Sequence, residues 1–207
     1  MRTAWKWSWP LAALVALVSP ARSAEQEKTV PEAGAVRVML LRQESVRDEL
    51  KLTKDETEKV HTFIDKQWKK AQEIEELKPE ERETKFAAMA KENEQFLKEV
   101  LEPREIERLD QITMQVAGML WVTQPEVASK LQLTEAQKTK AKGLQLEARK
   151  EMQELIHSAT REGKQEKLRE LRATSRKRLM ELLTDEQEAK WKQLAGAPFE
   201  GRLRFGE

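Results

Sequence analysis

Cysteine and tyrosine are absent from this chain of 207 residues, and histidine occurs only twice. Without cysteine the protein has no disulfides, no thiolate metal ligands and no site for lipid attachment at cysteine. A tight transition-metal site normally uses three or four histidine or cysteine ligands, and His61 and His157 are too few for one. A weak or intersubunit site that adds Asp65, four residues after His61, stays open. We therefore predict neither a metal site nor a cofactor.

Glycine and proline are scarce, with seven of each, and neither charge sign is in excess. Glutamate, lysine, glutamine, leucine and alanine dominate, which favours α-helix. The 38 basic and 37 acidic residues become 35 and 37 once residues 1–23 are removed, a net charge of about −2. A nucleic-acid-binding protein normally has a strongly basic surface, so no nucleic acid partner is predicted. The composition predicts an all-α protein with mixed charges on solvated helices.

Long apolar runs are also lacking, apart from residues 11–18 near the N-terminus. Two basic residues precede this run, and small residues follow at positions 21 and 23. The pattern is typical of a secretory signal peptide at 1–23, cleaved after Ser23 or alternatively after Ala24. The competing interpretation is a retained membrane anchor, although the run is short for a bilayer. We predict an exported, periplasmic protein without stable membrane insertion after cleavage.

Helical spacing of apolar residues continues along the chain and repeats itself. The apolar pattern from Val46 recurs from Val127 at an offset of 81, and that from Leu97 recurs from Leu179 at 82. We therefore predict long antiparallel helical hairpins in two tandem units that form one body. The first helix is expected at 35–50. The predicted segments are a flexible N-terminus at 24–34, a first helical unit at 35–117, a packed connector at 118–126, a second helical unit at 127–195 and an irregular tail at 196–207.

The pattern Leu-Thr-x-x-(Gln/Glu) occurs three times, each time where one helical pattern ends and another begins. A threonine at a helix N-cap accepts a backbone N–H, and glutamine or glutamate three residues later reaches back to the N–H of the cap. The spacing thus predicts three capping boxes, each worth about 1 kcal/mol. The motif residues are Leu52, Thr53 and Glu56, then Leu133, Thr134 and Gln137, then Leu183, Thr184 and Gln187.

These motifs, in an exported helical chain, resemble the Spy/CpxP-like LTxxQ family. The copies at 133–137 and 183–187 match fully, the copy at 52–56 has glutamate for glutamine, and 101–105 is a degenerate version. The resemblance implies a bent helical hairpin, often in a cradle-shaped dimer. It also implies an ATP-independent chaperone or an inhibitory partner of a sensor kinase, and one branch of the family binds zinc. The tandem arrangement departs from a single-hairpin member, and the cradle shape would then arise within one chain.

No motif for catalysis is present: the serines lack a nucleophile context, and there is no glycine-rich phosphate loop. We predict that the protein is not an enzyme. Large and flexible apolar side chains are the candidates for contacting protein partners, although each also suits a helical core. The basic stretch 161–178 is either a solvated face or a surface that attracts acidic clients. The candidate protein-binding residues are Phe63, Trp68, Met89, Trp121 and Met152.

The sequence thus favours a non-enzymatic periplasmic module that binds unfolded or envelope proteins, in the manner of a chaperone of envelope stress. One alternative is a helical adaptor or regulator that docks on a specific envelope partner. Another is a metal-binding or metal-sensing protein. A homodimer is compatible with each of these functions.

Overall fold

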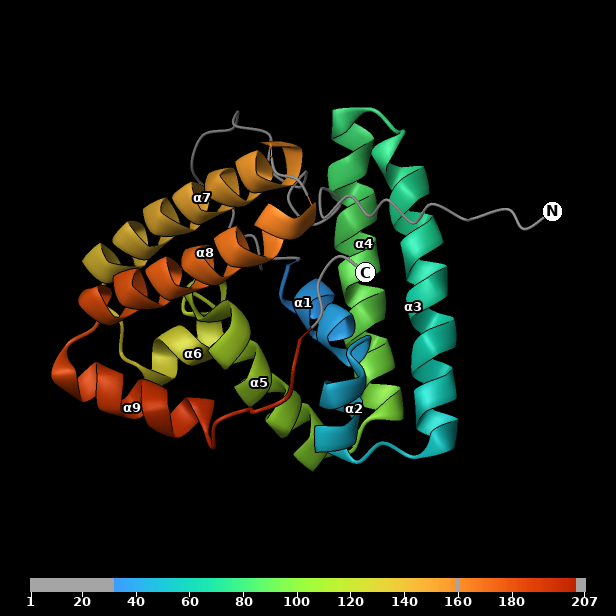
Figure 1. Ribbon diagram of the computed structural model, residues 1–207, viewed down its shortest axis with the longest axis horizontal. Helices are drawn as coiled ribbons and strands as arrows, with labels where there is room; N and C mark the ends of the chain where they lie inside the picture. Colours follow the sequence, from blue (N-terminus) through green and yellow to red (C-terminus); the bar gives the residue numbers. More distant parts are fainter. Residues whose placement is uncertain (1–31, 159–160, 204–207) are drawn as a thin grey trace.

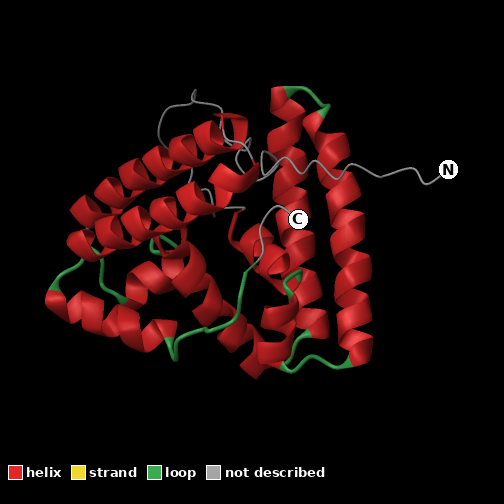
Figure 2. Cartoon of the chain, viewed as in Figure 1, coloured by secondary structure: helices red, strands yellow, loops and turns green. Residues whose placement is uncertain are grey.

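The computed structural model describes residues 32–158 and 161–203 of the chain, and its regular structure there is entirely helical. This confirms the predicted all-α class. Short loops join successive helices within 32–158 and within 161–195 (Figure 2). The nine helices of these residues are α1 (Glu32–Leu41), α2 (Glu44–Leu50), α3 (Lys54–Glu75), α4 (Pro79–Val100), α5 (Pro103–Trp121), α6 (Pro125–Lys130), α7 (Glu135–Ser158), α8 (Arg161–Leu182) and α9 (Asp185–Ala195).

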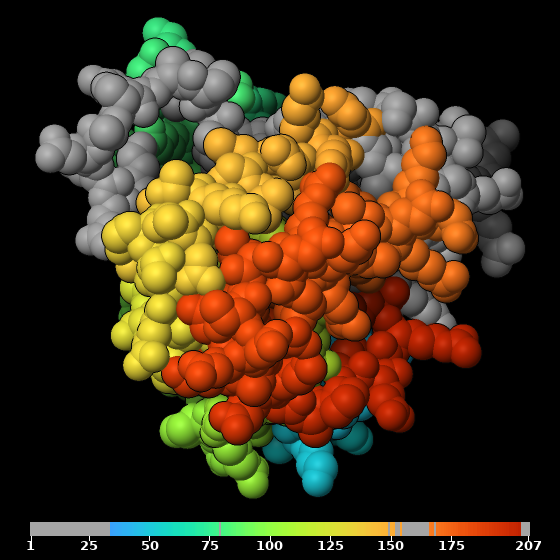
Figure 3. All heavy atoms as spheres, turned by 90° about the vertical axis from the view of Figure 1, so that its left-hand side faces the viewer, coloured from blue at the N-terminus to red at the C-terminus, as the bar shows by residue number. Residues whose placement is uncertain are grey.

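Two helical hairpins, α3–α4 and α7–α8, lie on opposite sides of the molecule, with α5 running between them (Figure 1). The α1 helix packs on α4 and α5, while α5 in turn packs on α8 and α9. Seen from the side, α7, α8 and α9 form the outer layer of one face (Figure 3). In the described part of the chain, α5 therefore supplies the main link between the two hairpins.

Local sequence signals explain where these helices begin. Pro79, Pro103 and Pro125 each occupy the first turn of a helix, where the missing N–H costs no hydrogen bond. Lys51 and Gln132 adopt left-handed backbone conformations, with φ of 58° and 55°, in the turns that precede α3 and α7. The α5 helix bends at Ala117, which has non-helical φ and ψ of −124° and 29°.

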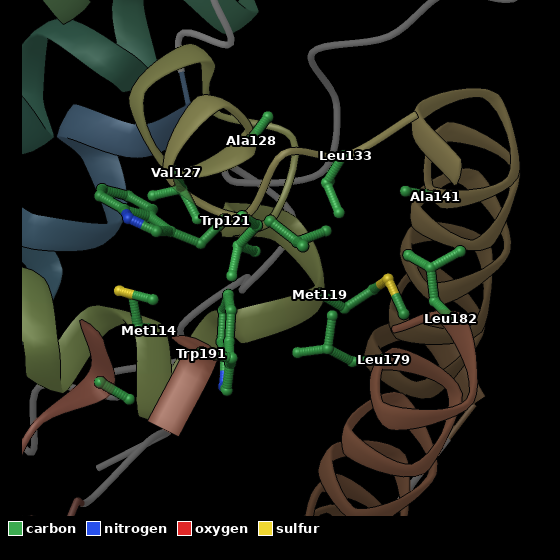
Figure 4. Close-up of a cluster of buried hydrophobic side chains, with 13 residues drawn as sticks. Met114, Met119, Trp121, Val127, Ala128, Leu133, Ala141, Leu179, Leu182 and Trp191 are labelled. Carbon is green, nitrogen blue, oxygen red and sulfur yellow. The ribbon is translucent and has the colours of Figure 1, made fainter. Parts of the chain in front are cut away.

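Buried apolar side chains form two main cores, one in each half of the described chain. The first core joins α1, α2, the start of α3, the end of α4 and the start of α5. The second joins the end of α5 to α6, α7, α8 and α9, and its two tryptophans, Trp121 and Trp191, are shown in Figure 4. A small third cluster of Ala71, Ile74 and Phe86 lies in the α3–α4 hairpin.

The predicted single helix at 35–50 is wrong, because the structure has two helices, α1 and α2, in this region. Gln43 is extended between them, with φ of −75° and ψ of 124°. The guanidinium of Arg47 donates to the carbonyls of Leu41 and Arg42, at 2.9 and 2.6 Å, and so satisfies carbonyls at the end of α1. The Arg47 side chain of α2 thus caps the end of α1. The spacing of apolar residues does not reveal such a contact.

Two predicted segment boundaries also shift. The helix α1 begins at Glu32, so the last residues of the proposed flexible N-terminus, 32–34, are helical, while 24–31 lie outside the described residues. The proposed connector 118–126 consists mainly of the end of α5 and the start of α6. Met119, Trp121 and Val122 from this segment are buried in the second core, because the apolar residues there fill the space against α8 and α9.

The last described residues, 196–203, have no regular structure and are called the C-terminal strap below. They return from α9 across α5 to α2, where the hydroxyl of Ser45 donates to the carbonyl of Arg202 at 2.8 Å. Gly196 begins the strap with φ of 66°, and a Cβ there would lie 2.3 Å from Gln111 Oε1. The backbone conformation therefore requires glycine, whereas the Gln111 amide is the end of a flexible side chain. The predicted tail beyond the strap, 204–207, lies outside the described residues.

Within the described ranges, no helix combines the length and the apolar character needed to cross a membrane. The predicted signal peptide at 1–23 lies outside these ranges.

Candidate functional site

All three predicted capping boxes form in the structure. At the start of α3, Glu56 N–H donates to Thr53 Oγ1 at 3.2 Å, and Thr53 N–H donates to Glu56 Oε2 at 2.8 Å. The same reciprocal pair has distances of 3.2 and 3.0 Å at Thr134, and 3.3 and 3.0 Å at Thr184. The threonine and the glutamine or glutamate of the motif thus satisfy backbone N–H groups at the helix starts.

The two full motifs also meet each other through their glutamines, which the sequence did not predict. Gln137 Nε2 donates to Gln187 Oε1 at 2.6 Å and to the carbonyl of Leu182 at 3.0 Å. Gln187 Nε2 donates in return to Gln137 Oε1 at 3.1 Å and to the carbonyl of Gln132 at 3.4 Å. This glutamine junction, formed by Gln137 and Gln187, ties the starts of α7 and α9 together. The glutamines therefore have both a capping role and a tertiary role.

The corresponding positions in the first half carry glutamates, Glu56 and Glu105. Glu105 is 5% exposed, and its carboxylate accepts from Glu102 N–H at 2.9 Å. Hydrogen bonds from the backbone N–H and hydroxyl of Thr53 lower the pKa of Glu56 below its usual value. Carboxyl groups have no N–H to offer each other, so they cannot form the reciprocal amide pair of the second half.

The surface of α3 carries the best-formed apolar contact among the candidate binding residues. Phe63 stacks on Phe96 of α4, with ring centroids 3.8 Å apart and planes within 1° of parallel. Both rings are half-buried and line a shallow open depression whose rim is charged. We call this surface the α3 face. The rim and wall residues of this depression are Asp55, Glu58, Lys59, Thr62 and Lys66.

The other candidate binding residues do not gather on this face. Trp121 is 4% exposed in the second core, with the guanidinium of Arg37 5.0 Å from its ring centroid, so its predicted role at a partner surface is wrong. Met89 is half-buried against the third cluster, and Trp68 is half-buried on α3. The side chain of Met152 lies outside the described residues. The structure therefore leaves Phe63 as the candidate with an open apolar contact.

A second flank of α3 has its own shallow depression, lined by Leu52, His61 and Asp65 among others. His61 is exposed, and the side chain of His157 lies outside the described residues. Among the described residues, no three histidine, aspartate or glutamate side chains are grouped as a metal site would need. A weak metal site at this flank would thus have only His61 and Asp65 as ligands from the described residues.

A partly buried charged cluster joins α1 to α4 and α5 in the first half. Arg37 Nη1 lies 2.9 Å from Glu94 Oε2 on α4, and Arg37 Nε lies 2.6 Å from Asp110 Oδ1 on α5. Burial raises the pKa of Asp110, and the nearby Arg37 charge opposes that rise. These ion pairs fix α1 between α4 and α5. No sequence pattern signals this cluster, because its three residues are far apart in the chain.

The comparisons with known proteins add no relative: no family model, curated protein or solved structure matches this chain.

Proposed function

We propose that this is an exported protein that binds exposed apolar segments of unfolded or envelope proteins without ATP. The observation that carries the proposal is the α3 face, where the Phe63–Phe96 stack is reachable at the floor of an open, charged depression. Half-buried aromatic rings offer apolar contact area, while the surrounding lysines and acids keep the surface solvated. The periplasmic location rests on the predicted signal peptide, and kinship with the Spy/CpxP-like family rests on the motifs.

The open shape of the α3 face suggests how such binding would work. A shallow depression buries little of any one ligand, and small buried areas give weak contacts. Because the charges on the rim have both signs, no strong electrostatic selection between partners is expected from them. Weak contact with many sequences suits a protein that holds unfolded chains transiently. No bound nucleotide enters this mechanism.

We further propose that the chain contains two tandem Spy/CpxP-like units. Helix order supports this, since α2, α3, α4 and the start of α5 parallel α6, α7, α8 and α9. The turns at Lys51 and Gln132, at an offset of 81, share a left-handed conformation, and the next N–H of each donates five residues back, at 3.1 and 3.0 Å. In this proposal α5 belongs to both units, because the part after Ala117 occupies the place against α8 and α9 that α1 occupies against α4 and α5.

The function is tested by suppression of aggregation. The mature chain should suppress aggregation of at least two unrelated unfolded proteins at near-equal molar ratio without ATP. Phe63→Ser should reduce this activity severalfold, because it removes one ring of the stack. Leu146→Ser is the matched control, because it removes a 55% exposed leucine from α7, far along the chain from the α3 face. Circular dichroism and thermal melts establish that both variants are folded.

A chain that protects none of the test proteins would overturn the proposal. Equal loss of activity in the two variants would instead place binding outside the α3 face. Crosslinking in intact cells separates the adaptor function from the chaperone function, because an adaptor should yield one dominant partner and a chaperone many.

A further inference from the structure

We propose that the groove filled by the C-terminal strap is a second binding site, whose ligand is an extended polypeptide segment with an aromatic residue. The strap would occupy the groove in cis and compete with that ligand. This inference rests on the proposed function in its choice of an unfolded protein as ligand. Its observations are independent of the α3 face, since the groove lies on α2 and α5.

The groove holds the strap through side chains that contact its backbone. Gln115 Nε2 donates to the carbonyl of Ala197 at 2.9 Å, and Gln115 Oε1 accepts from Phe199 N–H at 2.8 Å. The same Nε2 also donates to the carbonyl of Ala195, the last residue of α9, at 2.7 Å. Arg108 Nη1 also donates to the carbonyl of Ala197, at 2.8 Å. At the far end, Ser45 Oγ donates to the carbonyl of Arg202. Contacts with backbone groups do not depend on sequence, so an extended segment of another protein presents the same donors and acceptors.

Apolar contacts supply the remaining recognition. Phe199 and Leu203 of the strap are half-buried against the first core, which lies beneath the groove. Near Phe199, Gly201 is so close to Ser45 that a Cβ on it would lie 2.8 Å from the Ser45 Cβ. The groove therefore accepts an aromatic side chain, followed two residues later by a small one. This pattern defines the segment that should bind best.

The side chains that contact the strap are positioned by other helices. Arg108 Nε and Nη2 donate to Glu49 Oε1 of α2, at 2.9 and 2.6 Å, and Arg108 Nη1 donates to Gln111 Oε1 at 2.9 Å. Because Glu49 and Gln111 hold the guanidinium, its position does not depend on the strap alone. A site that is already organised loses less conformational freedom when a ligand binds.

The strap is also suited to detach. It has no regular backbone hydrogen bonding in the described residues and is continuous with the helical body only through Gly196. Surface segments outside regular structure open more readily than the core. Opening would expose the groove and leave both main helical hairpins in place. Peptide binding at the groove would thus be limited by competition with the strap.

The test uses the full mature chain and a fluorescent synthetic peptide with the sequence of residues 197–203. Replacing both Phe199 and Leu203 by serine should release the strap, and this release variant should bind the peptide at least tenfold tighter than the unaltered chain. Adding Gln115→Leu to the release variant should weaken binding at least tenfold. Adding Gln72→Leu instead, at an exposed glutamine of α3, should not change it. A peptide with serine in place of its phenylalanine should bind at least tenfold more weakly.

A folded release variant that does not bind the peptide would overturn the proposal. The proposal would also be overturned if adding Gln115→Leu left the affinity of the release variant for the peptide unchanged. If the double substitution unfolds the chain, Phe199→Ser alone serves as the release variant with the same expectations. The peptide measurement needs no aggregating client. Its failure is therefore distinguishable from failure of the aggregation assay, which tests the proposed function itself.

Discussion

The helix junctions of the two halves use the same cap but differ in the residue that completes it. In the second half, Gln137 and Gln187 exchange amide hydrogen bonds, so two caps become one tertiary contact. In the first half, the same positions are Glu56 and Glu105, which accept backbone N–H groups but have no N–H to donate. Capping thus needs only an acceptor at the third helical position, whereas the reciprocal contact between two caps also needs an N–H donor there.

A second contrast lies in the residues that occupy equivalent positions of the two halves. Position 37 carries an arginine that pairs with Glu94 and Asp110, whereas the position 81 residues later is Gly118. A Cβ on Gly118 would lie 2.8 Å from Trp191 Cζ2, so the tryptophan occupies the space beside the glycine. At this repeat position the first half thus has a charged side chain, and the second half has a glycine that leaves space for an aromatic ring.

The largest expected effect comes from removing that ring. Trp191→Ala should destabilise the protein by about 3–5 kcal/mol, because a large buried side chain leaves a cavity. The equivalent change in the first half, Leu109→Ala, should cost about 2–5 kcal/mol. Urea unfolding measures both. A clearly larger loss for Leu109→Ala would show that the first core, and not the tryptophan core, limits the stability of the chain.

Breaking the charged cluster should have the next largest effect. Arg37→Met should cost about 2–3 kcal/mol, because it leaves the half-buried Asp110 carboxylate without its cation. Adding Asp110→Asn removes the stranded charge and should recover part of that loss. Chemical unfolding of the single and double variants gives the coupling between the two residues. If the double variant is less stable than the sum of the two single changes predicts, the ion pair is not what holds α1.

The contrast between halves also shows which features the sequence revealed. Apolar spacing and the Leu-Thr motif predicted the helices and the three caps, because these depend on residues within a few positions of one another. The break between α1 and α2 depends on Arg47 reaching back to Leu41 and Arg42. The glutamine junction, the Arg37 cluster and the strap each join residues distant in the chain. Such contacts follow from how helices pack, and spacing in one sequence does not encode their partners.

Exchanging the junction residues tests the first contrast directly. Gln187→Glu should destabilise the protein by about 1–3 kcal/mol at neutral pH, because a carboxylate would then face Gln137 Oε1 and the Gln132 carbonyl without a proton to donate. Glu105→Gln should change stability by about 0.5 kcal/mol or less, since the amide oxygen still accepts Glu102 N–H. Denaturant midpoints at pH 7 measure both. Equal effects in the two halves would remove the distinction between cap and junction.

The smallest expected effect is a pH dependence at the Thr53 cap, the one box of the three that uses glutamate. The folded-state pKa of Glu56 lies below its ordinary value of 4.5, mainly because Thr53 N–H and hydroxyl donate to the carboxylate. A depressed folded pKa contributes stability that is present above about pH 4.5 and is lost as the pH falls through the lower, folded value. The second-half boxes at Thr134 and Thr184 use glutamine and have no such titration.

The stability advantage of the unaltered chain over Glu56→Gln should therefore shrink between pH 7 and pH 3, by an amount that the exposure of Glu56 keeps small. The control is Glu58→Gln, which removes an exposed carboxylate from the same helix but not from a cap. Carboxyl NMR shifts of Glu56 give its pKa independently. Two results would contradict this expectation: a Glu56 pKa at or above 4.5, or the same pH trend for both variants. Either would mean that the carboxylate of Glu56 stabilises the Thr53 box no more than a glutamine amide would. Charge would then play no part in the difference between the halves at this cap.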